Sequence, residues 1–286
     1  MNNMAPGRKT AAKWEKVLYK KQDFPDNYVD KSFLHEMKKN VNIKTYEYWN
    51  VVLETGMVTQ QLSSVSIFVV LFIYMDFGLL NPGSMVLVSA ALLLLGYALF
   101  IATDKTRKIS AKQDIQVMLI FLTFALGLSP VLQTLTETIS TDTIYAMTVF
   151  MLLGNVLFHD YGVSQAISSR SLSLNASVFA SVCLASRLPT SLHAFATVTL
   201  ALLVFALWPV LRKTLKNSNV HSAHAVMTLF SVTIATIALY SVSPMAAILF
   251  SLISFAITFL VPFWLIRLQP SKNNIHGPWD EAVIQN

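Results

Sequence analysis

The chain of 286 residues is 54% hydrophobic and only 13% charged. Soluble globular domains carry about 25% charged residues, so most of this chain must face lipid or other buried helices. The net charge of +6 lies outside the apolar stretches, which favours attraction to an anionic membrane leaflet over nucleic-acid binding. The single cysteine, Cys183, excludes an intrachain disulfide.

Residues 1–57 are mixed and polar, and we expect them to form a soluble arm. No apolar core follows Met1, so we expect no cleavable signal peptide. We also expect no lipid anchor, because residue 2 is asparagine and the C-terminal residues carry no prenylation signal. Apolar residues from Phe33 to Val41 are spaced for one helix face, which predicts an amphipathic helix from Lys31 to about Gly56. This helix would lie on the membrane or on a partner; the alternative is a plain solvated arm.

Eight apolar stretches follow the arm. Each predicts a membrane-spanning helix, since roughly 17–25 residues are needed to cross the hydrocarbon core. The stretch 171–188 is rich in serine and has the weakest hydropathy. Tight turns at Asn81-Pro82-Gly83 and at Ser243-Pro244 join two pairs of stretches into helical hairpins. The predicted spans are about 62–80, 84–103, 115–135, 143–159, 171–188, 192–211, 225–243 and 245–266.

The distribution of basic residues favours eight crossings over seven. Positive charges concentrate on the cytosolic side of membrane proteins. With eight spans, Arg187 alone among the 21 Lys and Arg residues lies on the opposite side, whereas a seven-span chain would divide them 16 against 5. The expected fold is therefore an all-α polytopic bundle of about eight transmembrane helices. It would comprise a cytosolic or interfacial arm (1–57), the membrane domain (58–266) and a cytosolic tail (267–286), with both termini cytosolic.

The serine-rich stretch also carries a packing pattern. Ser173, Ser177 and Ser181 recur every four residues, with alanines beside them. Small residues at this spacing allow helix backbones to approach closely in lipid. We expect this stretch to be a central helix of the bundle, shielded from lipid.

Ionisable side chains at membrane depth are costly and mark candidate functional sites. Asp76 and Asp160 lie near the ends of stretches, where water is close, so an ordinary solvated role is favoured for both. Glu137 and Asp142 bracket residues 138–141 between two stretches. They could form an acid–base pair, but capping of the next helix by Ser140 or its neighbours explains the same residues more simply.

Arg187 opposes the charge rule and precedes Leu188-Pro189. An arginine in this position either binds a phosphate or carboxylate or ties neighbouring helices together. His193 is more typical of an interior histidine than of a ligand.

Motifs for soluble chemistry are absent from the sequence. It has no His/Cys cluster for a metal, no glycine-rich phosphate loop and no nucleophile elbow. No polar segment reaches the roughly 100 residues of a nucleotide-binding domain. We therefore expect no metal, no cofactor and no catalytic residue.

Six long and unusual strings stand out in the chain. They are KWEKVLY (13–19), FPDNYVD (24–30), SPVLQTLTE (129–137), STDTIYAM (140–147), ASVCLASRLP (180–189) and NIHGPWDEA (274–282). In these strings the chain resembles the family of C subunits of phosphatidylinositol N-acetylglucosaminyltransferase, over about residues 13–284. One departure is His159 before Asp160-Tyr161-Gly162, where the family pattern has an aromatic residue, and this weakens any role for His159.

The resemblance implies transfer of N-acetylglucosamine from UDP-GlcNAc to phosphatidylinositol on the cytosolic face of the endoplasmic reticulum, the first step of glycosylphosphatidylinositol-anchor synthesis. It implies a complex whose sugar-transfer domain lies in another subunit, so this chain is not expected to be catalytic itself. We expect it to dock the catalytic subunit and other membrane subunits and to help shape a groove for phosphatidylinositol. The candidate lipid or partner contacts are Arg187, Arg212, Lys213, Lys216, Glu137, Asp142 and Asp160.

Two other function classes remain open. A lipid transporter or scramblase would have discontinuous helices, with which the short polar stretch 171–188 and the prolines at 130 and 244 are compatible. It would move lipid or solute without partners. A stand-alone membrane enzyme would transfer the sugar as a single chain.

Overall fold

The computed structural model describes residues 21–22, 24–25, 28, 38–39, 45–103, 111–134, 138–161, 170–217, 221–272 and 275–276. Contacts divide the chain into two compact units. One comprises Met1–Thr45 and Arg267–Asn286, and the other comprises Tyr46–Ile266.

In the first unit, strand β1 (Lys38–Lys39) pairs antiparallel with β2 (Ile275–His276). This pairing corrects the predicted amphipathic helix from Lys31 to about Gly56, of which only Tyr48–Gly56 is helical among the described residues, as the start of α2. Residues 38–39 are extended, residues 45–47 are not helical, and the first described helix begins at Tyr48. Residues 31–37 lie outside the described part of the chain. Periodicity is a local signal, and it cannot detect a backbone partner more than 200 residues away.

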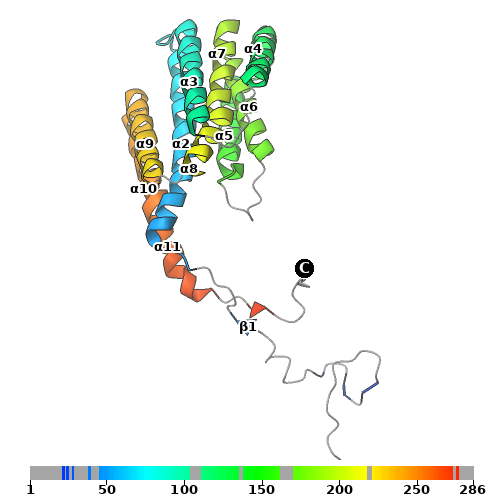
Figure 1. Cartoon of the computed structure of the whole chain (residues 1–286). Helices are drawn as coiled ribbons and strands as arrows, with labels where there is room; N and C mark the ends of the chain where they lie inside the picture. The colour runs from blue at the N-terminus through cyan, green and yellow to red at the C-terminus, as the bar shows by residue number, and fades with distance from the viewer. Residues whose placement is uncertain are drawn as a thin grey trace, which may run out of the picture. The chain divides into compact units, whose positions relative to one another are not determined.

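The second unit is a bundle of helices (Figure 1). Two π-helical turns, η1 (Leu203–Leu207) and η2 (Ala256–Leu260), join consecutive helices without a break, and the last helix continues into a 3₁₀ turn, η3 (Gln269–Ser271). The helices are α2 (Tyr48–Asp76), α3 (Pro82–Thr103), α4 (Ala111–Thr134), α5 (Thr141–Phe158), α6 (Arg170–Ala185), α7 (Ser191–Leu202), α8 (Trp208–Asn217), α9 (His221–Val242), α10 (Pro244–Phe255) and α11 (Val261–Leu268).

The polytopic all-α fold is confirmed. Within the described ranges, seven helices are long and apolar enough to cross a membrane. They are Tyr48–Asp76, Pro82–Thr103, Gln113–Thr134, Thr141–Phe158, Ser191–Leu215, His224–Val242 and Pro244–Ser271. The eighth predicted span corresponds to α6, a shorter apolar helix of 16 residues.

Helix α6 lies antiparallel to α5 along its whole length. Near one end, Asn155 of α5 hydrogen-bonds to Ser173 of α6. At the other end, Arg187 just beyond α6 donates to the carbonyl of Ile139 just before α5. Because α5 is long enough to span a membrane, a helix that accompanies it from end to end covers the same depth.

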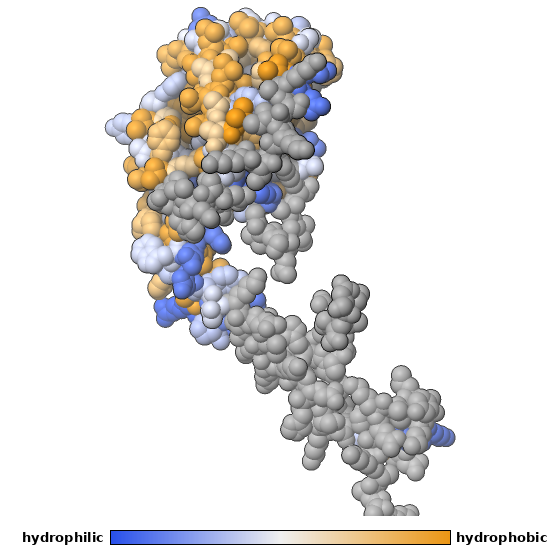
Figure 2. Space-filling view, viewed as in Figure 1, coloured by the Kyte–Doolittle hydropathy of each residue, from blue (hydrophilic) through white to orange (hydrophobic). Residues whose placement is uncertain are grey.

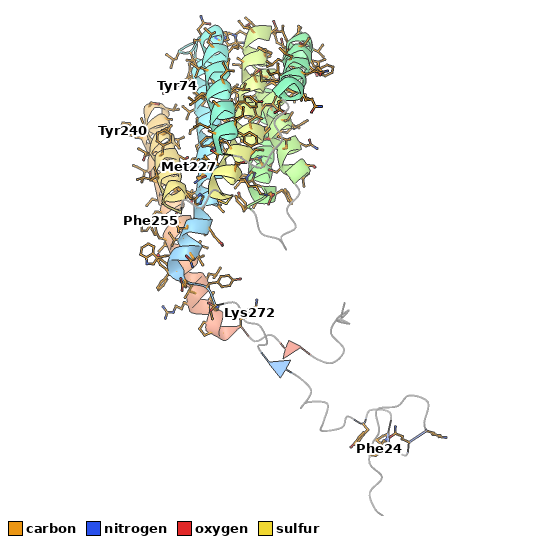
Figure 3. All side chains as sticks on the ribbon, in the orientation of Figure 1. Phe24, Tyr74, Met227, Tyr240, Phe255 and Lys272 are labelled. Carbon is orange, nitrogen blue, oxygen red and sulfur yellow. The ribbon has the colours of Figure 1, made fainter. Side chains whose placement is uncertain are left out.

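The two ends of the bundle are distinguished by the loops they carry. We call the end where α2 begins the arm-side end and the opposite end the turn end. The turn end holds the α2–α3 turn, where Gly78 has a φ of 68° and the Asn81 side chain accepts a hydrogen bond from the Gly83 amide. It also holds the α9–α10 turn, where Ser243 caps α10 and Tyr74 hydrogen-bonds to Ser241; Tyr74 is labelled in Figure 3.

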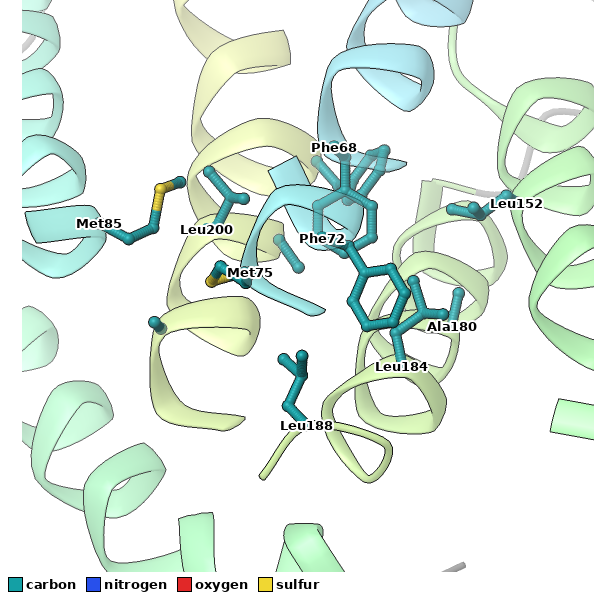
Figure 4. Close-up of a cluster of buried hydrophobic side chains, with 12 residues drawn as sticks. Phe68, Phe72, Met75, Met85, Leu152, Ala180, Leu184, Leu188 and Leu200 are labelled. Carbon is teal, nitrogen blue, oxygen red and sulfur yellow. The ribbon is translucent and has the colours of Figure 1, made fainter. Parts of the chain in front are cut away.

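The apolar core forms around the C-terminal half of α2, against α3, α5, α6 and α7 (Figure 4). Phe68 is fully buried and stacks edge-on against Phe205, with their ring centroids 5.2 Å apart. Phe72, Met75, Leu152 and other apolar residues complete the cluster. In contrast, α3, α4 and α9 are mostly exposed in the single chain, and apolar residues cover much of the visible face of the bundle (Figure 2). These faces suit lipid or the helices of other subunits.

Candidate functional site

A group of buried and half-buried polar side chains links five helices in the arm-side half of the bundle. In an apolar environment such groups are costly unless they are hydrogen-bonded, so a network of them marks a candidate site. We call this group the polar cluster; it comprises Gln60 and Gln61 of α2, Asn155 of α5, Ser173 of α6, Arg212 of α8 and Thr228 of α9.

Arg212 is the charged member of the polar cluster, and only 4% of its surface is exposed. Its Nη2 donates to Oε1 of Gln61 at 2.6 Å, and its Nη1 donates to Oε1 of Gln60 at 3.5 Å. Its Nε is buried and has no hydrogen-bond partner among the described residues. The guanidinium is therefore held by two neutral amides.

The amide of Gln61 is fixed from its other side. Its Nε2 donates to Oδ1 of Asn155 at 2.8 Å. The Nδ2 of Asn155 donates to both the carbonyl and the hydroxyl oxygen of Ser173 at 3.0 Å, and the Ser173 hydroxyl donates to the Asn155 carbonyl at 2.9 Å. These contacts bind α2, α5 and α6 together and orient the Gln61 oxygen toward Arg212.

The amide of Gln60 is fixed in the same way by α9. Its Nε2 donates to the Thr228 hydroxyl at 2.7 Å, which donates in turn to the His224 carbonyl at 3.0 Å. The His224 Nε2 lies 2.9 Å from the Leu53 carbonyl. Helices α2 and α9 approach closely here because α2 has a glycine at position 56, where a Cβ atom would lie 2.8 Å from the Thr228 hydroxyl.

The π-helical turn η1 explains why Arg212 points inward. In η1 the Trp208 amide bonds to the Leu203 carbonyl, five residues earlier. Such a turn adds one residue to the helix, and one residue rotates the following face by about 100°. The predicted span 192–211 ends before Arg212 and places it in the following loop, and the loop is wrong. The helix continues to Asn217, and Arg212 is buried against α2.

Among the described residues, no ionisable neighbour of Arg212 supplies a negative charge that pairs with its guanidinium. Asp160 pairs with Lys213 at 3.2 Å, and the two side chains are 30% and 56% exposed. The Tyr161 hydroxyl donates to the Val156 carbonyl at 2.6 Å. Burial raises the pKa of the Tyr161 phenol to about 12, although the positive charge of Arg212 opposes the rise. Tyr161 is therefore neutral at physiological pH and does not balance Arg212.

Other residues singled out in the sequence lie at the turn end. Arg187 is half-buried, and its Nη2 donates to the Ile139 carbonyl at 3.0 Å. Ser140 caps α5, as the capping interpretation predicts, with Asp142 in the first turn. Glu137 lies outside the described residues.

The structure thus brings together only some of the predicted site residues. Arg212 and Ser173 share the polar cluster, and Lys213 and Asp160 lie beside it. The side chain of Lys216 lies outside the described part. Ser173, Ser177 and Ser181 are all buried on α6.

Sequence reasoning missed Gln60, Gln61 and Asn155. Their signal was an amide inside or beside an apolar stretch, which was available in the sequence but carried no charge to attract attention. Within the described ranges, no three His, Cys, Asp or Glu side chains are grouped as a metal site would require.

Known proteins resemble this chain over almost its whole length. The family model described as phosphatidylinositol N-acetylglucosaminyltransferase matches residues 14–280. The human C subunit of phosphatidylinositol N-acetylglucosaminyltransferase is 54% identical over 278 residues, which cover 96% of this chain and 93% of the human protein. The protein of the same name from Bos taurus is also 54% identical, and one phosphatidylinositol N-acetylglucosaminyltransferase subunit of Schizosaccharomyces pombe is 40% identical over 94% of this chain and 86% of its own length. No solved structure matches the chain.

Proposed function

Because the chain belongs to the family of C subunits of phosphatidylinositol N-acetylglucosaminyltransferase, we propose that it is a non-catalytic membrane subunit of that transferase. The complex would transfer N-acetylglucosamine from UDP-GlcNAc to phosphatidylinositol in the first step of glycosylphosphatidylinositol-anchor synthesis. The match over residues 14–280 is the observation that carries this proposal.

The fold supports a scaffolding role. The described residues form a helical membrane bundle and include no domain of the size that a nucleotide-binding fold needs. The donor and the chemistry would then belong to another subunit. The exposed apolar faces of α3, α4 and α9 offer this chain's docking surface for the membrane anchors of its partners.

We propose eight crossings in the endoplasmic reticulum membrane, with both termini cytosolic. β1 precedes the first span and β2 follows the last, and two segments paired in one ladder lie on the same side. The chain would then cross the membrane an even number of times. Seven of the described helices are long enough to span, and α6 would be the eighth because it lies beside α5 from end to end. The distribution of basic residues then favours the cytosol for this side.

The exposed charges beside the polar cluster are the proposed contacts with a partner subunit or with lipid head groups. Lys213 and Asp160 pair at this surface, and Lys216 follows on the same helix. Neutralising Lys213 and Lys216 together should weaken complex assembly or phosphatidylinositol affinity. Unchanged values of both would remove these lysines from the proposal.

The subunit role is tested by replacing the native protein with a tagged copy in cells and purifying it under mild conditions. We expect transferase activity to copurify with the tag and to be absent from the tagged chain alone. Tagged protein recovered without transferase activity would contradict the proposal.

The transporter or scramblase alternative is tested with the purified chain in vesicles. Transporter sites commonly form where helices are broken and unwound. Here the helices continue through η1 and η2 without an unwound segment. We expect no lipid flux above that of protein-free vesicles, and flux by the chain alone would favour the alternative.

A further inference from the structure

Resting on the proposed subunit role, we propose that Arg212 binds the phosphate group of the lipid acceptor. The polar cluster would hold its guanidinium ready for a phosphodiester at the arm-side edge of the membrane. Four observations support this assignment: the unused donors of Arg212, its charge, its fixed orientation and its depth.

The first observation is the set of donors that remains. A guanidinium carries five N–H groups in a planar fork that matches the oxygens of a phosphate. The protein uses one from Nη1 and one from Nη2, both for glutamine amides. The Nε–H is buried without a partner in the described structure. Nε and a neighbouring Nη can together form the two parallel hydrogen bonds that arginine makes to phosphate.

The second observation is the charge. A buried cation is costly unless an anion compensates it. The amide oxygens of Gln60 and Gln61 solvate the guanidinium but leave its positive charge in place. The neighbouring carboxylate, Asp160, pairs with Lys213, and the phenol of Tyr161 is neutral. A phosphodiester carries the single negative charge that would balance Arg212.

The third observation is the rigid orientation of the two glutamines. Each amide is bound on its donor side, Gln60 by Thr228 and Gln61 by Asn155. Their oxygens are therefore directed at Arg212 before any ligand arrives. A side chain held in this way loses little conformational entropy on binding, which is the usual design of a ligand site rather than of a surface charge.

The fourth observation is depth, which favours a lipid over the sugar nucleotide. Gln60 lies roughly 24 Å along α2 from Asp76 at the turn end, at a rise of about 1.5 Å per residue. The hydrocarbon core is about 30 Å thick. If α2 enters that core near Asp76, Gln60 lies a few ångströms inside its opposite boundary. The phosphate of a phospholipid lies just outside this boundary, within reach of a long arginine side chain, whereas a soluble nucleotide remains in the water beyond the head groups.

The experiment measures binding to the purified complex in micelles of a non-ionic detergent that contains no phosphate. The ligands are short-chain phosphatidylinositol, the matching diacylglycerol and UDP-GlcNAc. We expect phosphatidylinositol, but not diacylglycerol, to raise the thermal unfolding temperature. Arg212→Gln should weaken phosphatidylinositol binding by about tenfold or more, since hydrogen bonds to charged groups are the stronger class. The matched control Arg187→Gln removes a guanidinium at the turn end of the bundle, bound to the Ile139 carbonyl, and should leave this affinity unchanged.

A second variant keeps the test decisive if Arg212→Gln does not fold. Gln60→Glu places a carboxylate against Arg212, while the Thr228 hydroxyl can turn to donate to it. This internal anion should preserve the fold and compete with the lipid phosphate. Unchanged phosphatidylinositol affinity in a folded Gln60→Glu complex would overturn the proposal, because it would show that Arg212 acts only as a structural tie.

The remaining outcomes distinguish phosphatidylinositol from UDP-GlcNAc as the ligand of Arg212, and failure of this inference from failure of the proposed subunit role. A loss of UDP-GlcNAc binding with phosphatidylinositol binding intact would reassign Arg212 to the nucleotide and overturn the lipid assignment. If transferase activity still copurifies with the complex but neither variant changes phosphatidylinositol binding, this inference alone is refuted. Failure of the subunit role itself would appear earlier, as the absence of transferase activity from the purified wild-type sample.

Discussion

Two arginines, one in each half of the bundle, differ in what surrounds them. Arg187 lies in the α6–α7 turn, is half-buried and donates to the backbone carbonyl of Ile139. Arg212 is buried in a helix, and its described partners are the neutral amides of Gln60 and Gln61. A backbone carbonyl bound at a half-buried turn suits a structural tie between two helix ends, whereas two buried and oriented amides suit a receptor for an anion. The environment of each arginine therefore indicates its role better than its position in the sequence.

The largest expected effect comes from removing the main support of Arg212. Gln61→Leu deletes the oxygen 2.6 Å from Nη2 and leaves a buried charge with poorer solvation. We expect the complex to lose about 3–5 kcal/mol of stability, measured by thermal or denaturant unfolding. Gln116→Leu on the exposed face of α4 is the matched control. Equal effects of the two variants would mean that the polar cluster has no special importance.

Helix α6 runs from the polar cluster to the turn that carries Arg187, so a larger side chain inserted into its packed face should disturb both regions. Ser177 is fully buried, one helical turn after Ser173 and before the turn that carries Arg187. Ser177→Leu should cost about 1–3 kcal/mol and weaken complex assembly, as judged by unfolding and by copurification. Ser171→Leu, at an exposed position of the same helix, serves as control. A stable and fully active Ser177→Leu complex would count against close packing of α6.

Arg187→Gln sharpens the contrast between the two arginines. It removes one charge-assisted hydrogen bond to the Ile139 carbonyl at a half-buried site. We expect a loss of about 1–2 kcal/mol in unfolding experiments and no change in phosphatidylinositol affinity. A drop in affinity like that expected for Arg212→Gln would break the distinction and give the turn end a lipid site of its own.

The smallest effect is expected at the exposed pair. Lys213→Gln breaks the contact of 3.2 Å with Asp160, but both side chains are partly in water. Its effect on stability should stay below about 1 kcal/mol and vanish at high salt, which screens surface charges. The measurement is unfolding at low and high ionic strength. A large effect that salt does not change would mean that Lys213 belongs to the buried site.

Much of the fold could be predicted because it depends on local properties. Helix length, apolar content and turn residues all lie within short windows of the chain, so the order of the helices, the two tight hairpins and the Ser140 cap were accessible. The site was less accessible. Arg212 was identified only as a basic residue of a loop, and its partners Gln60, Gln61 and Asn155 were not identified at all.

By itself, the sequence determined the membrane class, the approximate spans and the family, because hydropathy and long shared strings can be recognised without knowing which residues are in contact. Only the tertiary structure decided which side chains face the interior. The π-helical turn η1 rotates α8 so that Arg212 meets α2, and the absence of a side chain at position 56 lets α9 supply Thr228 to Gln60. The pairing of β1 with β2 is equally non-local. Such features depend on helix rotation and on partners distant in the chain, and no short window of sequence contains either.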